Sequence, residues 1–294
     1  MDGILVIRKE KGFTSHDVVA KLRGILHMKK IGHTGTLDPD AEGVLPIVLG
    51  KATKLADLLT EKEKTYEALL HLGLETDTQD ITGKILKESP VTQDEDQVRK
   101  AAESFLGSQM QVPPMYSALK INGKKLCDLA REGKTVERPA RPVHFYGIEI
   151  LDLQLPYVNL RVTCSKGTYI RTLCHDIGRK LGCGGCMEKL VRTRSGRFSL
   201  EEALSLSEVK TLFEEGTLSK KILSIEEVLA EYPKVSGTAQ ADRLLENGNG
   251  VGAAYTESGT TQGWVRMYTS TGRFVGVYEW NKEREIYLPV KMFL

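Results

Sequence analysis

The sequence predicts an α+β protein that ends in a small β-rich module. Over about the first 230 of its 294 residues, helical and strand-like stretches follow one another without a regular strand–helix–strand repeat, so a doubly wound parallel sheet is not favoured. Around Tyr232–Pro233 the composition becomes richer in glycine, and the hairpin-like GWVRMYTSTGRFVGVYEW and IYLPVKMFL follow. We therefore divide the chain near Glu231 into a larger domain, 1–231, and a module, 232–294.

Local signals predict the first elements. Thr14 and Asp17 have the spacing of a capping box at the start of TSHDVVAKLRGIL, whose apolar residues keep helical spacing. VLPIVLG and KTYEALLHLG are typical of strands, and the second alternates and ends at Gly73. VTQDEDQVRKAAESFLG predicts a helix that is capped at Thr92 and ends at Gly107.

The middle of the chain continues this mixture. QVPPMYSALKINGKKL is a proline-anchored loop, and its INGK predicts a tight turn. VHFYGIEILDLQLPYVNLRVTCSKGTYI predicts a pair of strands, and SLEEALSLSEVKTLFEEG predicts a helix that begins at Ser199. Between them YIRTLCHDIGRKLG predicts a helix with one apolar face, made of Ile170, Leu173, Cys174, Ile177 and Leu181.

Composition excludes several classes of protein. With 40% hydrophobic and 27% charged residues the chain is typical of a globular protein, and no run approaches the roughly 18 apolar residues of a membrane span. The apolar run in the opening MDGILVIRKEK is shorter than the apolar region of a secretory signal peptide. Five cysteines, an odd and low number, argue against a disulfide framework. We expect a cytoplasmic protein without membrane contact.

Positive charge is segregated on a chain whose net charge is only +2. Residues 120–144 carry seven lysines or arginines against three acids, and residues 166–197 carry eight against two. Residues 201–231 carry eight acids against three lysines. Any one such run is usually a solvated helix face, but together the basic runs indicate a face that meets a polyanion.

One carboxylate, Asp38, stands in a glycine- and threonine-rich turn within IGHTGTLDPDAEGVLPIVLGKATKL. A phosphate-binding P-loop is excluded, because six residues rather than four separate Gly43 from Gly50, and Ala52 replaces the magnesium-binding hydroxyl. Two chemical hypotheses remain for this turn, a metal site and a nucleophile, beside a plain strand-connecting turn.

The metal hypothesis rests on acids at alternate positions, Asp38, Asp40 and Glu42, and no recognised metal motif or further acid cluster supports it. A lone nucleophile would use the glycines for close approach and the threonine hydroxyls to orient the acid. In the structural alternative Asp38 bonds its own backbone. No second acid has an obvious partner role in the sequence.

The pair CGGC, Cys183 to Cys186, with Cys174 and His175 nearby, could be written as a zinc set. However, Cys174 and His175 are adjacent in a predicted helix and point to different sides. Cys174 also falls on the apolar face, and a thioredoxin-like context is missing. We interpret these cysteines as structural.

Six blocks decide between the alternatives: DGILVIRKEKGFTSHDVV, GHTGTLDPDAEGVLPIVLGKATKL, KTYEA, PPMYSALKINGKKLCDLAREG, GTYIRTLCHDIG and LVRTRSG. In this order they resemble the TruB-type family of tRNA pseudouridine-55 synthases, and they cover most of residues 1–200. The resemblance implies the pseudouridine synthase fold, a central mixed or antiparallel sheet flanked by helices. It implies isomerisation of uridine 55 in the tRNA T-loop to pseudouridine.

The resemblance also implies roles for individual residues. Asp38 matches the catalytic aspartate, Arg171 the arginine paired with it, and Tyr66 the tyrosine that stacks on the base and is implicated in moving the C5 proton. Tyr169 and Leu190 match residues of the uridine pocket, and His33 matches a histidine that contacts displaced nucleotides. Residues 120–144 match a mobile thumb, and the last 60 or so residues look like a PUA-type module. Two positions differ from the common pattern without touching a catalytic one: Cys186 and Val191.

The physical reading agrees with this resemblance. A flipped uracil needs stacking partners, and basic segments supply phosphate contacts. The isomerisation is redox-neutral and consumes no activated group, so we expect no cofactor and no metal. We expect a monomer that binds the T-arm of tRNA; the alternative is a catalytically silent tRNA binder or folding chaperone that uses the same pocket. The residues expected to contact RNA through their charge are Lys120, Lys124, Lys125, Arg131, Arg192 and Arg194.

Overall fold

The structure is a computed structural model that describes residues 1–121, 123–257 and 262–294. Its largest feature is a mixed sheet, in which nine strands of the described chain take part in the order β1-β3-β12-β4-β11-β10-β7, with β2 beside β3 and β13 beside β12. The pair β3–β12 is parallel and the other pairs are antiparallel. The strands are β1 (Gly3–Lys9), β2 (Ile31–His33), β3 (Glu42–Leu49), β4 (Lys64–Leu72), β7 (Gly107–Gln111), β10 (Arg141–Gln154), β11 (Tyr157–Cys164), β12 (Gly185–Ser195) and β13 (Phe198–Ser199).

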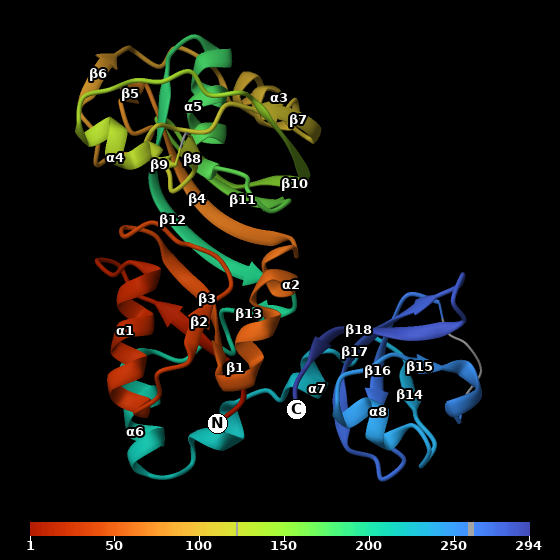
Figure 1. Ribbon diagram of the computed structural model, residues 1–294. Coiled ribbons are helices and arrows are strands. Elements are labelled where there is room, and N and C mark those ends of the chain that lie inside the picture. The colour runs from red at the N-terminus through yellow and green to blue at the C-terminus, as the bar shows by residue number, and fades with distance from the viewer. Residues whose placement is uncertain (122, 258–261) are drawn as a thin grey trace.

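Helices cover this sheet in two groups, and the predicted α+β class is confirmed. Figure 1 shows the long strands β4 and β12 running from a lower part, with β1 to β3, to an upper part, with β10 and β11. Helices α1 and α6 lie beside the lower part, and α3 and α5 lie on the upper part. These helices are α1 (Ser15–Leu26), α3 (Glu95–Glu103), α5 (Ile170–Leu181) and α6 (Leu206–Glu214).

The upper and lower parts of this sheet have separate hydrophobic cores. Leu22 of α1 and Val209 of α6 are buried with the β1–β3 strands, whereas Leu173 of α5 and Val98 of α3 are buried against β4, β10 and β11. The site described below lies where the two parts meet. Shorter elements complete this region: η1 (Gly50–Leu55), α2 (Ala56–Thr60), β5 (Leu74–Thr76), β6 (Ile85–Glu88), β8 (Lys120–Ile121), β9 (Lys124–Lys125), α4 (Leu126–Arg131), η2 (Leu218–Lys221) and α7 (Ile225–Val228).

Two predicted helix starts are wrong, and the reason is the same in both. Helix α3 is capped by Asp94 in a capping box with Gln97 rather than by Thr92, and it ends before Gly107, which opens β7. Helix α6 is capped by Ser205, not Ser199, because Ser199 belongs to β13 and pairs with β12. Each segment offers several capping residues; in α3 the capping box of Asp94 is the one that forms, and for α6 strand pairing removes Ser199.

The other predicted elements agree with the structure. Thr14 caps α1 in a capping box with Asp17, and α5 buries its predicted apolar face. The predicted INGK turn includes Asn122, which lies outside the described residues; Ile121 and Lys124 on either side of it pair as β8 and β9. In the described part of the chain, no helix has the length and apolar character that crossing a membrane requires.

The C-terminal residues form their own β-rich module. Its sheet has the order β14-β16-β17-β18-β15. Val277 and Phe293 are buried in one cluster with Ile4 and Val44, so the module packs against the larger sheet. Figure 1 shows this module beside β1 and α2. Its elements are β14 (Lys234–Ser236), α8 (Asp242–Glu246), β15 (Val251–Gly252), η3 (Ala253–Tyr255), β16 (Trp264–Tyr268), β17 (Phe274–Asn281) and β18 (Ile286–Met292).

Candidate active site

Asp38 lies in the loop between β2 and β3, and buried groups hold this loop from both sides. The backbone N–H of Leu37 donates to Ser15 Oγ at 2.9 Å, at the first turn of α1. Lys9, which is fully buried, donates from Nζ to the carbonyl of Pro39 at 3.1 Å. Asp38 thus has fixed neighbours on each side, while its own side chain remains 44% exposed.

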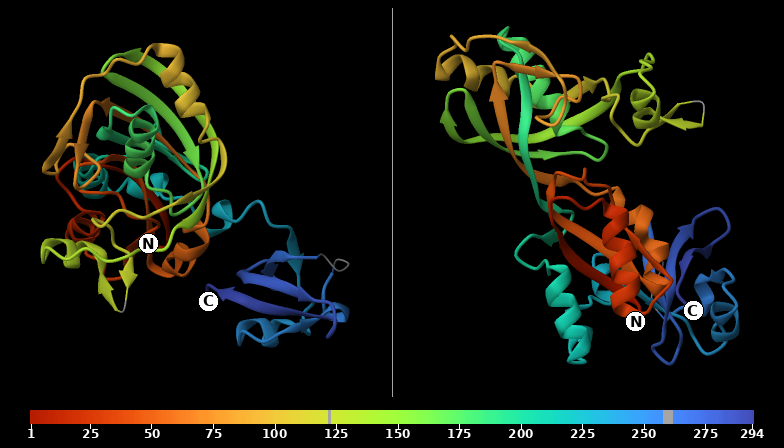
Figure 2. Two further views of the ribbon diagram at one scale, coloured as in Figure 1. Left: turned by 90° about the horizontal axis from the view of Figure 1, so that it is seen from above. Right: turned by 90° about the vertical axis from the view of Figure 1, so that its left-hand side faces the viewer.

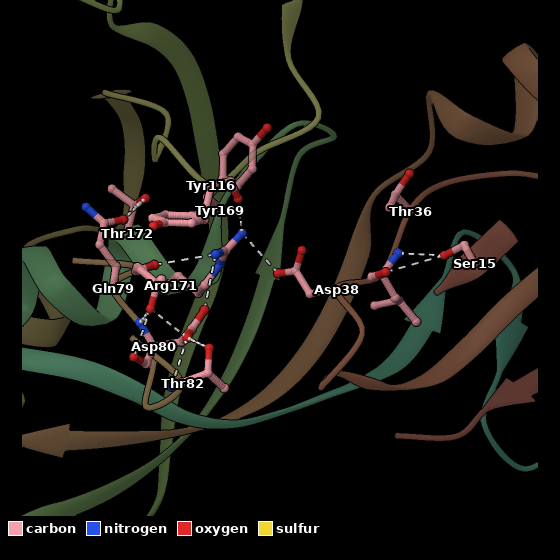
Figure 3. A network of polar contacts seen from close by, with 12 residues as sticks. Ser15, Thr36, Asp38, Gln79, Asp80, Thr82, Tyr116, Tyr169, Arg171 and Thr172 are labelled. Atoms are coloured by element: carbon pink, nitrogen blue, oxygen red, sulfur yellow. Dashed lines mark hydrogen bonds and ion pairs between the residues drawn. The ribbon is translucent and has the colours of Figure 1, made fainter. Parts of the chain in front are cut away.

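Arg171, at the start of α5, binds the Asp38 carboxylate. Its Nη2 lies 3.1 Å from Asp38 Oδ2 and donates to the carbonyl of Tyr116 at 2.9 Å. Its Nη1 lies 3.1 Å from Asp80 Oδ2. Figure 3 shows the guanidinium between the two carboxylates. The ion pair that the resemblance implied is therefore present in the structure.

Asp80 corrects the interpretation that no second acid has a partner role. It follows β5 in the sequence TDTQDITG, and its Oδ1 accepts from the hydroxyls of Thr78 and Thr82 at 2.8 and 2.6 Å. This leaves Oδ2 for Arg171 (Figure 3). An aspartate followed two residues later by threonine signals a local turn, but nothing in that signal points to an arginine 91 residues away.

The electrostatics of Asp38 depend on this arginine. Burial raises the pKa of the Asp38 carboxyl above its ordinary value, the charge of Arg171 lowers it, and the charge of Asp80 raises it again. Burial is the largest of these effects. Arg171 is therefore the main group that favours the ionised form of Asp38, although the net effect of its surroundings is to raise the pKa.

A cavity of about 340 Å³ brings most of the predicted site residues together. Its lining includes Asp38, Tyr66, Tyr169, Arg171 and Leu190, which come from four different parts of the chain. Burial raises the pKa of both tyrosine hydroxyls, so both are neutral near neutral pH. The arrangement offers a carboxylate paired with an arginine beside two aromatic rings and an aliphatic wall, which suits a planar, uncharged base.

His33 does not line this cavity. It ends β2, and its ring lies edge-on to that of His16, with centroids 5.6 Å apart. Burial lowers the pKa of His33, and the neighbouring His16 lowers it further. A contact of His33 with nucleotides beside the target base stays a prediction.

Arg192 does not belong to an exposed basic face as predicted. It is only 1% exposed, its Nε donates to the carbonyl of Val44 at 2.8 Å, and it lines the cavity beside Tyr66. The strand β12 lies in the middle of the sheet, so alternate side chains of its basic run point inward. Counting charges along the sequence could not separate Arg192 from Arg194, which is half-exposed and pairs with Glu63 at 2.7 Å.

The predicted thumb residues are exposed. Lys120, Lys124 and Lys125 lie on the β8–β9 pair, which with α4 projects from the upper part of the molecule in the right-hand view of Figure 2. Arg131 of α4 pairs with Asp128 at 3.4 Å and lines a second cavity, of about 580 Å³, that also reaches Asp38. Of these residues, Arg131 is the one that lines a cavity shared with Asp38.

Cys174, Cys183 and Cys186 are buried, and all five cysteines are free thiols. Cys174 packs with Leu173 and Ile177 in the core of the upper part. Over the described ranges, no group of three or more histidines, cysteines or acids is placed to hold a metal ion.

Comparison with known proteins identifies the family. The model of the "TruB family pseudouridylate synthase (N terminal domain)" matches residues 23–170, and that of the "tRNA pseudouridylate synthase B C-terminal domain" matches residues 171–230. The chain belongs to the TruB family of pseudouridylate synthases. Members of this family are isomerases that act on tRNA, and the silent-binder alternative is not favoured.

Relatives named tRNA pseudouridine synthase B match the chain along its length. The protein of Lachnoclostridium phytofermentans is 48% identical and covers 100% of both chains, and that of Clostridium novyi is 46% identical over 94% of this chain and 95% of its own. Among solved structures, a Cbf5–Nop10–Gar1 complex has a chain with 29% identity and a TM-score of 0.76, covering 99% of this TruB-family chain and 85% of its own. The fold is therefore that of the pseudouridine synthases, with a PUA-like module after it.

Proposed function

We propose that this chain isomerises uridine 55 in the T-loop of tRNA to pseudouridine, with Asp38 as the nucleophile. The observation that carries the proposal is the 3.1 Å contact of Arg171 with Asp38 in the wall of a cavity that also holds Tyr66. A carboxylate that is ionised in a partly dry site is a competent nucleophile. The cavity volume of about 340 Å³ is at the small end of ligand sites, as expected for one flipped nucleoside.

Each side chain around Asp38 has its own role in the proposed reaction. Arg171 holds the carboxylate ionised and aimed, because a charge-assisted contact favours the charged form. Tyr66 stacks on the uracil and takes part in moving the C5 proton, and Tyr169 and Leu190 enclose the base. The reaction is redox-neutral and its product has the same composition as its substrate, so it needs no cofactor. His33 contacts nucleotides displaced with the target.

The partner is the T-arm of tRNA. Lys120, Lys124 and Lys125 are exposed and carry no ion pair among the described residues, so phosphates can replace solvent around them. Arg131 and Arg194 would exchange an acidic partner for phosphate. Residues 1–231 hold the catalytic site and residues 232–294 add an RNA-binding module. The protein works as a monomer in the cytoplasm, where its five free thiols stay reduced.

The deciding experiment is to incubate purified protein with an unmodified tRNA transcript and to map pseudouridine in the product. We expect one pseudouridine, at position 55, and none with Asp38→Asn, which keeps the size and polarity of the side chain but cannot attack. Affinity of Asp38→Asn for tRNA should stay within a few-fold. Binding without turnover in the wild type would instead support a silent tRNA binder.

A further inference from the structure

Arg192 carries a positive charge inside the protein without a counter-charge. Its Nε and Nη1 donate to the carbonyls of Val44 and Thr36 at 2.8 and 3.4 Å, while its Nη2 is buried and has no hydrogen-bond partner in the described structure. The ion pairs found among the described residues do not include it, whereas Arg171 has two. A buried cation without an acidic partner is unfavourable for folding. We therefore infer that Arg192 has a functional role in the cavity that contains Asp38.

The neighbour that this charge acts on is Tyr66. In the antiparallel pair of β12 and β4, Arg192 stands directly opposite Tyr66, and residues so paired point to the same face of a sheet. Both side chains line the cavity that contains Asp38. On its other side Arg192 pairs with Gly43 of β3, where a Cβ would lie 2.2 Å from the Arg192 carbonyl oxygen. The absence of a side chain at Gly43 lets β3 lie close against the backbone of β12 at Arg192.

The chemistry of Tyr66 needs such a neighbour. An ordinary tyrosine has a pKa of about 10, and burial in the cavity raises the pKa of Tyr66 further. A neutral phenol cannot take up a proton unless it first gives up its own. Burial has the largest effect; the charge of Arg192 opposes it and lowers the pKa of Tyr66, while Cys164 and Asp38 raise it.

We propose that Arg192 is a positioning residue for Tyr66: its buried guanidinium stabilises the phenolate, and the phenolate removes the proton from C5 of the rearranged uracil. The inference deepens the proposed function and rests on it. In the rearranged intermediate the N1–C1′ bond has broken, C5 is bonded to C1′ of the ribose, and the Asp38 carboxylate is free again. The C5–H bond then breaks, its electron pair forms the C5=C6 double bond, and the C6=N1 π pair moves to N1. The proton passes to the Tyr66 oxygen, which had released its own proton to solvent, while N1 takes one proton from solvent.

A titration of the free protein tests the electrostatic part without any activity. Ultraviolet difference titrations of wild type against Tyr66→Phe and against Tyr278→Phe give the ionisation of each phenol separately. Tyr278 is the matched comparison, because burial alone raises its pKa, to about 12. We expect Tyr66 to ionise at lower pH than Tyr278, and Arg192→Gln to move the Tyr66 midpoint upward by about one unit or more. A wild-type Tyr66 that ionises no earlier than Tyr278 overturns the proposal, even if Arg192→Gln does not fold.

Single-turnover rates at saturating tRNA test the catalytic part, with uridine or [5-²H]uridine at the target. In Arg192→Gln we expect a rate at least about tenfold lower near neutral pH, since each unit of pKa removes nine-tenths of the phenolate. The deuterium isotope effect should rise, because removal of the C5 proton becomes slower. Arg192→Lys keeps the charge and should restore most of the rate.

Other outcomes separate a structural role from the proposed one. Equal losses in Arg192→Gln and Arg192→Lys, with unchanged isotope effects and an unchanged Tyr66 midpoint, would show that Arg192 only supports the fold and would overturn the proposal. Arg192→Gln should also change nothing further in a Tyr66→Phe background. If the wild type forms pseudouridine while these tests fail, the proposed function stands and only the role of Arg192 falls.

Discussion

Replacing Arg171 with alanine removes the cation that Asp38 and Asp80 share. The guanidinium is buried and lies 3.1 Å from an oxygen of each carboxylate. Loss of one partner of a buried charge pair typically costs about 3–5 kcal/mol of stability. Because Asp38 is 44% exposed, water screens that half of the network, and we expect about 2–4 kcal/mol.

The catalytic effect should exceed the effect on tRNA binding. Without Arg171 the two largest remaining influences on Asp38, burial and the charge of Asp80, both raise its pKa, and the smaller effect of Lys9 is the one that still lowers it. The ionised form of the carboxylate is then less favoured, and its charge is no longer held in one orientation. We expect the single-turnover rate at saturating tRNA to fall about 10²- to 10³-fold, as for other preorganised charges. The direction of this change in the pKa of Asp38 can be tested, because the rate of the variant should increase with pH over a range where the wild-type rate does not change.

The assay is a single-turnover measurement of pseudouridine formation at several pH values, with tRNA affinity measured in parallel. Arg171→Lys should recover part of the rate, because lysine keeps the charge but cannot reach both carboxylates with a planar fork. The matched control is Arg161→Ala, whose arginine also contacts two carboxylates, at 3.0 Å each, but on the exposed side of the sheet. An Arg171→Ala enzyme with a normal saturated rate and only weaker tRNA binding would refute the reasoning.

Three further predictions follow from the same structure. Neutralising Lys124 and Lys125 together should weaken tRNA binding and reduce its salt dependence by about one to two units, and an unchanged slope would show that these charges do not face RNA. Gly43→Ala should destabilise the protein by about 2–4 kcal/mol in denaturant unfolding, because Gly43 has a φ of 116° and a Cβ would meet the backbone of β12 at 2.2 Å. Its control is Gly216→Ala, where φ is 72° but no atom lies within 4 Å, and an equal loss there would exclude the steric explanation. Burial lowers the pKa of Lys9 from 10.5 to about 8, so the unfolded chain binds more protons between these values. The free energy of unfolding should therefore rise with pH across that window relative to Lys9→Met, by up to about 1.4 kcal/mol per pH unit, and parallel curves for the two proteins would contradict the burial of a charged Lys9.

Elements that depend on neighbours in the chain could be predicted from the sequence. The capping box of Thr14 and Asp17 starts α1 because both partners lie within one helical turn. The apolar face of α5 and the alternation of β4 follow in the same way from spacing. The starts of α3 and α6 could not be fixed, because several capping residues compete and pairing of β13 with β12 removes one candidate.

The sequence determined the loop of Asp38, the basic segments and, through resemblance, the residues that gather around the cavity. Only the tertiary structure decided which side chains meet. Arg171 lies between Asp38 and Asp80 because the N-terminal end of α5 lies beside the two loops that carry these aspartates. No local sequence pattern encodes that contact. Likewise Arg192 and Arg194 are two residues apart in one basic run, yet the first is buried and the second pairs with Glu63 at the surface. The physical reason is that charge is a property of the residue, whereas burial is a property of the sheet that surrounds it.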